Sequence, residues 1–206
     1  LKNEFIAMLG HELRNPLAPI RSGVEFLRRT LAGGSGSGQV CEMIERQVAH
    51  MSRLLDDLLD VTRITRGEIR LQPETIDVRT IVQRAVEASR PLLESHRHEL
   101  QVRLPQDELA VHGDAVRLVQ MMTNLLNNAA HYTPEGGRIE VSVEGLSDHI
   151  TIRVKDNGVG LAPDLQDCIF DLFVRGPMPE HGSREGLGIG LSLVRRLVNR
   201  IGVSLR

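Results

Sequence analysis

Apolar side chains recur at a seven-residue spacing through the first third of the chain. From Leu13 to Leu31 they follow one another at steps of four and three, and a second series from Ile44 to Thr62 repeats these steps. This spacing predicts two helices that each carry one apolar stripe. The segment GGSGSG at 33–38 predicts a flexible connector, natural or engineered, between the arms of an antiparallel hairpin. Because one hairpin buries little apolar surface, we expect two copies to pair as a four-helix bundle, making the chain a homodimer.

A different pattern follows Arg70, where the seven-residue spacing stops. Apolar side chains alternate at period two near 139–143 and 150–154, which predicts a β-hairpin with one buried face. The other expected elements are an extended piece near 75–78, a strand near 99–104, and helices at 79–95, from the N-cap Asp114 to 130, at 163–169 and at 189–200. The predicted fold class is therefore α+β: a helical hairpin (1–70) followed by an α/β sandwich (74–206) in which helices cover one face of a mixed sheet.

The composition argues against two classes of partner. Basic and acidic residues are nearly balanced, 25 against 27, and aromatic residues make up 2%, so we expect no nucleic-acid partner. No apolar run approaches the roughly 18 residues of a membrane span, and the first residues lack the layout of a signal peptide. We therefore expect no membrane contact by this segment and a cytoplasmic location. Cys41 and Cys168 lie far apart without metal-ligand spacing, which indicates neither a disulfide nor a metal site.

The first polar motif is His11-Glu12 on the first helix. His11 lies about 200° around the helix from Leu13, so its imidazole points away from the apolar stripe. An imidazole there can act as a nucleophile, with Glu12 orienting its second nitrogen and accepting its proton. Asn15 faces the same side one turn further on. The alternative is a surface histidine beside a helix bend at Pro16.

A second motif lies near the end of the helix that follows Asp114. Asn124 and Asn128 are four residues apart and share a face, so their amide oxygens can converge on a magnesium ion that holds a triphosphate. His131 can then meet phosphate, and Tyr132 can pack on a base. The alternative is that the asparagines cap and fray the helix before a turn.

Glycine-rich segments complete the set of motifs. Asp156 follows a strand and can accept the exocyclic amine of adenine, while Gly158 and Gly160 let the backbone approach the ring. The glycine-rich segment that leads into the last helix suits polyphosphate, because helix N-termini present unpaired N–H groups; its residues are Gly186, Leu187, Gly188 and Gly190. Phe173 ends an aromatic hinge at 170–173, and the stretch 175–185 that follows, rich in Gly, Pro and charge, is typical of a mobile lid. The alternatives are plain turns and loops.

Taken in order, these motifs resemble the H, N, G1, F and G2 boxes of bacterial two-component sensor histidine kinases. Residues 1–70 resemble the HisKA-type dimerisation and phosphotransfer domain. Residues 74–206 resemble the Bergerat-type (GHKL) ATP-binding domain, and the chain stops before the final strands expected of that sheet. The resemblance implies that His11 is the phosphoacceptor, Glu12 the base that assists it, and Asn15 the residue that favours dephosphorylation of the partner.

The same resemblance implies ATP and Mg²⁺ as cofactors and an aspartate of a response-regulator receiver domain as the final acceptor. It assigns magnesium to Asn124. The other implied nucleotide-binding residues are Asn128, His131, Tyr132, Asp156, Gly158, Gly160, Phe173, Gly186, Leu187, Gly188 and Gly190.

Two alternatives are a non-catalytic dimeric scaffold for docking or phosphotransfer, and an ATPase of the same nucleotide fold. The gyrase and Hsp90 families, which share this fold, use a glutamate where Asn124 stands, and an amide cannot act as a general base. The resemblance therefore implies slow hydrolysis of ATP and transfer to a nucleophile brought from outside, His11. The clearest departure is His131, where many family members carry lysine or arginine, so we expect nucleotide affinity to weaken between about pH 6 and 8.

Overall fold

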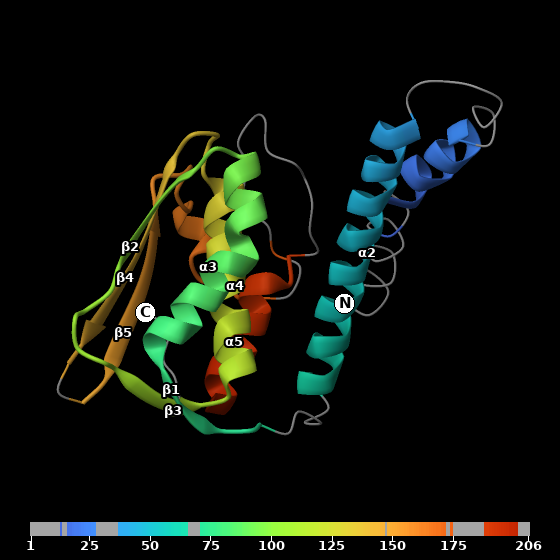
Figure 1. The fold of residues 1–206 in the computed structure, drawn as a ribbon. Helices are drawn as coiled ribbons and strands as arrows, with labels where there is room; N and C mark the ends of the chain where they lie inside the picture. The colour runs from blue at the N-terminus through green and yellow to red at the C-terminus, as the bar shows by residue number, and fades with distance from the viewer. Residues whose placement is uncertain are drawn as a thin grey trace. The chain divides into compact units, whose positions relative to one another are not determined.

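The computed structural model describes residues 13, 16–27, 37–65, 71–146, 148–171, 174 and 188–201. The chain separates into two compact units, Leu1–Arg63 and Ile64–Arg206. Figure 1 shows both units, the first drawn in blue and cyan and the second from green to red. In the described part of the chain, no helix combines the length and the apolar character needed to cross a membrane.

The first unit contains a helical segment at 16–27 and all but the last two residues of the helix α2 (Ser37–Thr65). The two helices approach closely at Gly23, where a Cβ atom would lie 2.8 Å from Met43 Cε and 3.1 Å from Ile44 Cδ1. α2 begins at Ser37, inside the predicted connector, and a Cβ atom placed on Gly38 would meet no described atom within 4 Å.

The apolar stripe of this unit is partly uncovered. Leu54, next to the predicted position Leu55, is buried, but large apolar side chains at the predicted spacing are exposed, and Val48 keeps 50% of its surface accessible. The exposed residues at predicted positions are Leu17, Val24, Val48 and Leu55, and Phe26 and Leu59 are exposed outside that spacing. A single hairpin therefore buries only part of the apolar surface that the sequence pattern predicts to be buried.

The second unit is an α+β layer structure, which confirms the predicted fold class. Its elements in order are β1 (Glu74–Asp77), α3 (Val78–Ser95), β2 (Glu99–Arg103), β3 (Ala110–Gly113), α4 (Ala115–Tyr132), β4 (Arg138–Gly145), β5 (Ile150–Asp156), the short 3₁₀ helix η1 (Pro163–Leu165) and α5 (Gly190–Ile201). β2 pairs with β4 in parallel and β4 pairs with β5 antiparallel, so this sheet is mixed. β1 and β3 form a separate antiparallel pair.

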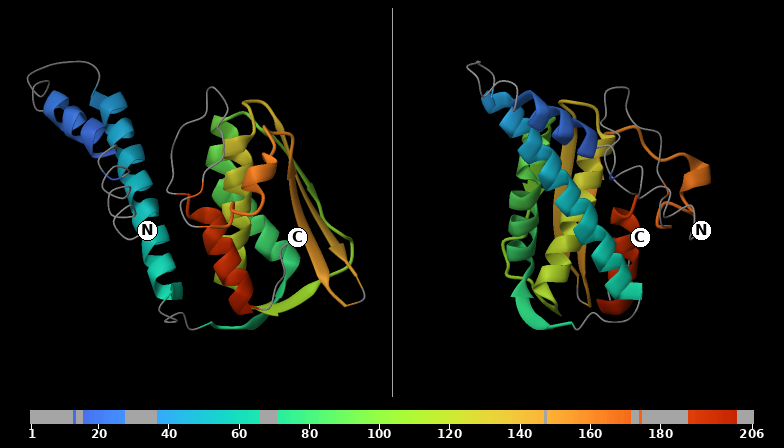
Figure 2. Two further views of the ribbon diagram at one scale, coloured as in Figure 1. Left: turned by 180° about the vertical axis from the view of Figure 1, so that it is seen from behind. Right: turned by 90° about the vertical axis from the view of Figure 1, so that its right-hand side faces the viewer.

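Three helices, α3, α4 and α5, lie on one face of the β2-β4-β5 sheet, as the two further views make clear (Figures 1 and 2). Alternate residues of β4 point into the core, and Ile139 and Val141 are 0% exposed. They pack against Leu126 of α4 and Ile81 of α3. The other face of β4 carries partly or fully exposed polar residues, which is the alternation that the period-two pattern predicts.

One predicted element of the second unit is wrong, and one observed strand was not predicted. The helix expected at 163–169 is a three-residue 3₁₀ helix followed by turns, since none of its residues is buried and an isolated short helix is not stable. The sequence pattern does not predict β3, because four residues with a glycine at the end give no readable period. Its partner β1 coincides with the expected extended piece.

Candidate nucleotide site

α4 holds the central asparagines, and its start is fixed by an N-cap. The side chain of Asp114 accepts a hydrogen bond from the backbone N–H of Arg117 at 3.1 Å, as the sequence predicted. Met122, Leu126 and Ala129 bury one face of the helix. Asn124 and Asn128 are half-buried on an adjoining face.

The two asparagines lie beside the first residue of α5. A Cβ atom placed on Gly190 would be 3.8 Å from Asn124 Oδ1 and 3.8 Å from Asn128 Nδ2. A side chain larger than hydrogen at this position would therefore stand against both amides. The structure thus brings the first residue of α5 next to two asparagines of α4 that lie far from it in the sequence.

The amide nitrogens of Asn124 and Asn128 are buried, and neither has a hydrogen-bond partner among the described residues. A buried amide without a partner costs about 1–3 kcal/mol, so such groups in a native fold indicate a missing ligand or water. These N–H groups suit phosphate oxygens. The same side chains also offer carbonyl oxygens, which magnesium accepts as ligands.

The N-terminus of α5 adds further donors. The first helical hydrogen bond runs from Leu193 N to Ile189 O at 2.8 Å, so the N–H groups of residues 190–192 precede it. Gly188 has a φ of 66°, a conformation that favours glycine, and this turns the chain into the helix. Together with the helix dipole these donors form an anion site next to the two amides.

The loop after β5 forms the second half of the site. Asp156 is exposed at the strand end, and its Oδ1 accepts a hydrogen bond from Gly158 N at 2.9 Å. This bond fixes the carboxylate and leaves Oδ2 to accept an amine. Gly160 has a φ of 70°, and a Cβ atom placed on it would meet no described atom within 4 Å. Glycine is therefore needed at 160 for its backbone conformation and not for space.

The same loop is tied to the end of α4. Val159 N donates to Tyr132 O at 3.1 Å. A Cβ atom on Gly158 would overlap that carbonyl oxygen. Glycine at 158 is therefore required by close packing of the loop on α4, a reason that the sequence did not reveal.

His131 lies in a group of three histidines that the sequence did not indicate. Its ring meets the ring of His96 edge-on with centroids 6.2 Å apart, and His96 stacks on His98 at 5.6 Å. Nε2 of His98 contacts the backbone oxygen of Ala130 at 2.9 Å. His96 and His98 come from the connection between α3 and β2, so their meeting with α4 depends on the tertiary fold.

Several predicted site residues lie outside the described residues. These are His11, Glu12, Asn15, Phe173, Gly186 and Leu187. Within the described ranges, no group of three His, Cys, Asp or Glu side chains is placed to hold a metal ion. A magnesium ion at Asn124 would therefore depend on amide and phosphate oxygens.

Comparison with known proteins agrees with this geometry. Residues 113–206 match the family model described as "Histidine kinase-, DNA gyrase B-, and HSP90-like ATPase", and residues 1–67 match the "His Kinase A (phospho-acceptor) domain". The adaptive-response sensory kinase SasA of Thermosynechococcus vestitus is 33% identical over 205 residues, which cover 96% of this chain and 53% of SasA. The chain belongs to the two-component sensor histidine kinases.

This histidine kinase core is also 31% identical over 204 residues to the signal transduction histidine-protein kinase/phosphatase MprB of Mycolicibacterium paratuberculosis, covering 96% of the chain and 38% of MprB. The chain thus spans about half the length of SasA and less of MprB. Among solved structures, full-length ShkA in complex with AMPPNP matches with a TM-score of 0.68 and 26% identity over 97% of this chain and 41% of that one. The histidine kinase ThkA in complex with the response regulator TrrA shares the fold, with a TM-score of 0.59 and 21% identity over 84% of this chain and 50% of that one.

Proposed function

We propose that this chain is an ATP-dependent protein histidine kinase core that phosphorylates its own His11 and passes the phosphoryl group to an aspartate of a response regulator. The observation that carries the proposal is the convergence of two buried amides, Asn124 and Asn128, on the N-terminus of α5. The N–H group of Asn128 and the helix end offer donors to a polyphosphate at a single place, and Asn124 turns its carbonyl oxygen toward the same helix end. The nucleotide in the related ShkA structure supports the same assignment.

The nucleotide is held at both ends. Asp156 Oδ2 accepts a hydrogen bond from the exocyclic amine of adenine, and Tyr132 packs near the base. Asn128, His131 and the glycines of the α5 N-terminus bind phosphate; these glycines are Gly186, Gly188 and Gly190, with Leu187 between them. Gly158 and Gly160 shape the base loop, and Phe173 belongs to the lid. Asn124 holds Mg²⁺, which supplies charge neutralisation and orientation of the phosphates when bound.

Phosphoryl transfer uses a nucleophile from the other unit. A nitrogen of His11 forms a bond to the γ-phosphorus, the bond from that phosphorus to the β,γ-bridging oxygen breaks, and ADP leaves. Glu12 accepts the imidazole proton. Asn124 offers no carboxylate to activate water, so hydrolysis in the pocket is slow.

The phosphohistidine then transfers its phosphoryl group to a carboxylate oxygen of the receiver domain, and the N–P bond breaks. Asn15 promotes the opposite reaction, dephosphorylation of the response regulator. The name of the relative MprB, a histidine-protein kinase/phosphatase, supports this role. The hairpin pairs with a second copy as a four-helix bundle, which its exposed apolar stripe supports. Because ATP is a cytoplasmic substrate, the proposed activity places this segment in the cytoplasm.

Incubation with γ-labelled ATP and Mg²⁺ tests the proposal. We expect label on the protein that is lost in acid and kept in base, as a phosphoramidate requires, and no label on His11→Gln. Label that persists on His11→Gln would contradict the proposal. Release of free phosphate without protein label would favour the ATPase, and binding of a receiver domain without any label would favour the scaffold.

A further inference from the structure

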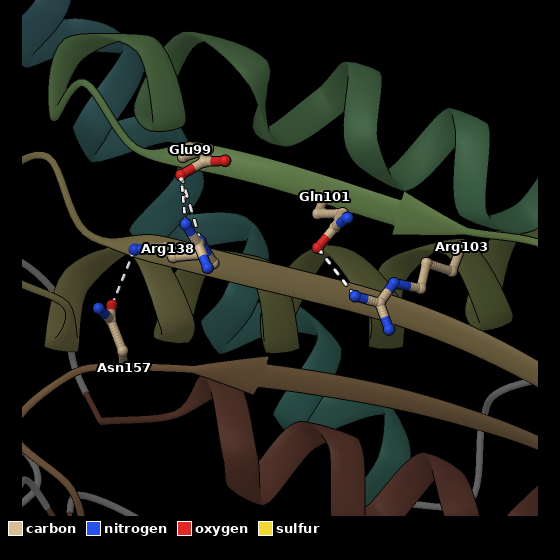
Figure 3. Close-up of polar contacts among 5 residues, drawn as sticks. All are labelled: Glu99, Gln101, Arg103, Arg138 and Asn157. Carbon is tan, nitrogen blue, oxygen red and sulfur yellow. Dashed lines mark hydrogen bonds and ion pairs between the residues drawn. The ribbon is translucent and has the colours of Figure 1, made fainter.

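The end of the β4–β5 ladder is closed by a side chain. The last paired residues are Ile139 and Asp156. One step beyond, Asn157 N donates to Arg138 O at 3.2 Å, as a regular ladder would continue. The return bond is different, because Arg138 N donates to the side-chain Oδ1 of Asn157 at 2.7 Å (Figure 3).

This substitution of a side chain for the main chain has a geometric consequence. In a regular antiparallel pair the two residues exchange both backbone bonds, which would hold the carbonyl of Asn157 in the sheet. Here Oδ1 takes that place, so the main chain can turn away directly after Asp156. The turn leads into Gly158, which donates to Asp156 Oδ1, and Val159, which donates to Tyr132 O.

The sequence around the partner strand makes room for this contact. A Cβ atom on Gly137 would lie 2.9 Å from Asn157 Oδ1 and would overlap the side chain of Thr133. On the other edge of β4, Gly137 O accepts a hydrogen bond from Glu99 N at 2.9 Å, and the Arg138 side chain pairs with Glu99 at 3.2 Å (Figure 3). The main chain that Asn157 contacts is thus held by the neighbouring strand.

We propose that Asn157 is a positioning residue that sets base specificity by holding Asp156 in place for the exocyclic amine. The inference rests on the proposed function, since it assumes that Asp156 reads adenine. In this proposal Asn157 acts through Asp156 and not by its own contact with the base or phosphate. It fixes where the strand stops and so where the carboxylate of Asp156 stands.

The test compares ATP with inosine triphosphate, which carries an oxygen in place of the exocyclic amine. Affinities of the full chain for each nucleotide, with Mg²⁺, are measured by calorimetry. We expect the parent to prefer ATP and Asn157→Ala to lower the ATP-to-ITP affinity ratio by about tenfold, the factor that one lost hydrogen bond can carry. Partial unfolding would lower both affinities equally and leave the ratio unchanged.

Two further variants sharpen the result. Asn157→Asp keeps an oxygen for Arg138 N, so it should restore the ratio even if its added charge weakens both nucleotides. Gln101→Ala removes another side-chain amide of the same sheet, one that accepts a bond from Arg103 at 3.2 Å, and should keep the parent ratio (Figure 3). An unchanged ratio in Asn157→Ala, or an equal fall in Gln101→Ala, would overturn the inference while the parent's preference for ATP still stands. A parent without that preference would instead contradict the assignment of Asp156 in the proposed function.

Discussion

The buried amide nitrogens of Asn124 and Asn128 lack described hydrogen-bond partners, which lowers the stability of the folded chain, and the proposed ligand would supply those partners. Replacing Asn128 with alanine deletes a buried amide nitrogen without a described partner, so we expect the unfolding free energy to stay equal or to rise by up to about 1 kcal/mol. We expect the affinity for Mg·ATP to fall by at least about tenfold, since a charge-assisted bond is lost. Thermal unfolding and calorimetric titration measure the two effects.

Asn127→Ala is the matched control for this substitution. Asn127 also has a buried side-chain atom without a described partner, Oδ1, but it lies one residue away, about 100° around the helix. We expect a similar effect on stability and no loss of nucleotide affinity. Equal loss in both variants would show that the amides act through the packing of α4.

His131 gives a prediction on pH. Imidazole titrates near neutrality, and its protonated form attracts phosphate, so we expect ATP affinity to weaken as the pH rises from about 6 to 8. Titrations of the parent and His131→Ala at several pH values measure this, and identical curves would rule out a phosphate contact.

At this scale the sequence predicted what depends on local spacing. A spacing of four residues on a helix places Asn124 and Asn128 on one face, and the structure places both beside Gly190. The contact of Asn157 with Arg138 was not predictable, because it joins two strand ends whose register only the folded sheet defines. The histidine group was missed for the same reason.

Among the elements, α4 is the one whose start should matter most. Asp114 caps it through Arg117 N, and its second oxygen accepts from Gln72 N at 2.9 Å. We expect Asp114→Ala to lower the unfolding free energy by about 1–2 kcal/mol, with a lower melting temperature. Asp107→Ala, in an exposed loop, should leave the melting temperature unchanged. Equal effects of the two substitutions would contradict the capping role.

The sequence predicted the elements that have a clear period or cap. α3, α4, β4 and β5 lie within about two residues of their expected bounds. The failures were β3 and the helix at 163–169, both short and with little or no buried surface. The bounds of the two domains stay a prediction.

For the whole molecule the exposed stripe of the first unit leads to a prediction on assembly. Val48 and Leu55 are 50% and 45% exposed in the single chain. If a second copy covers them, Val48→Glu combined with Leu55→Glu should convert a dimer to a monomer in sedimentation velocity, because buried unpaired charges are costly. Val116→Glu is the control, since Val116 is 70% exposed but lies on α4 in the other unit. A dimer that survives the double substitution would contradict the bundle.

The parallel pairing of β2 with β4 has a consequence for the order of folding. Glu99 pairs with Arg138, and the chain between these strands contains β3 and all of α4. The mixed sheet therefore cannot close until this long crossover is in place, which raises the contact order of the second unit and slows its folding. Because α4 lies inside this crossover, we expect the proposed nucleotide site to be complete only once the sheet has closed, so a newly made chain should gain its capacity for ATP late in folding.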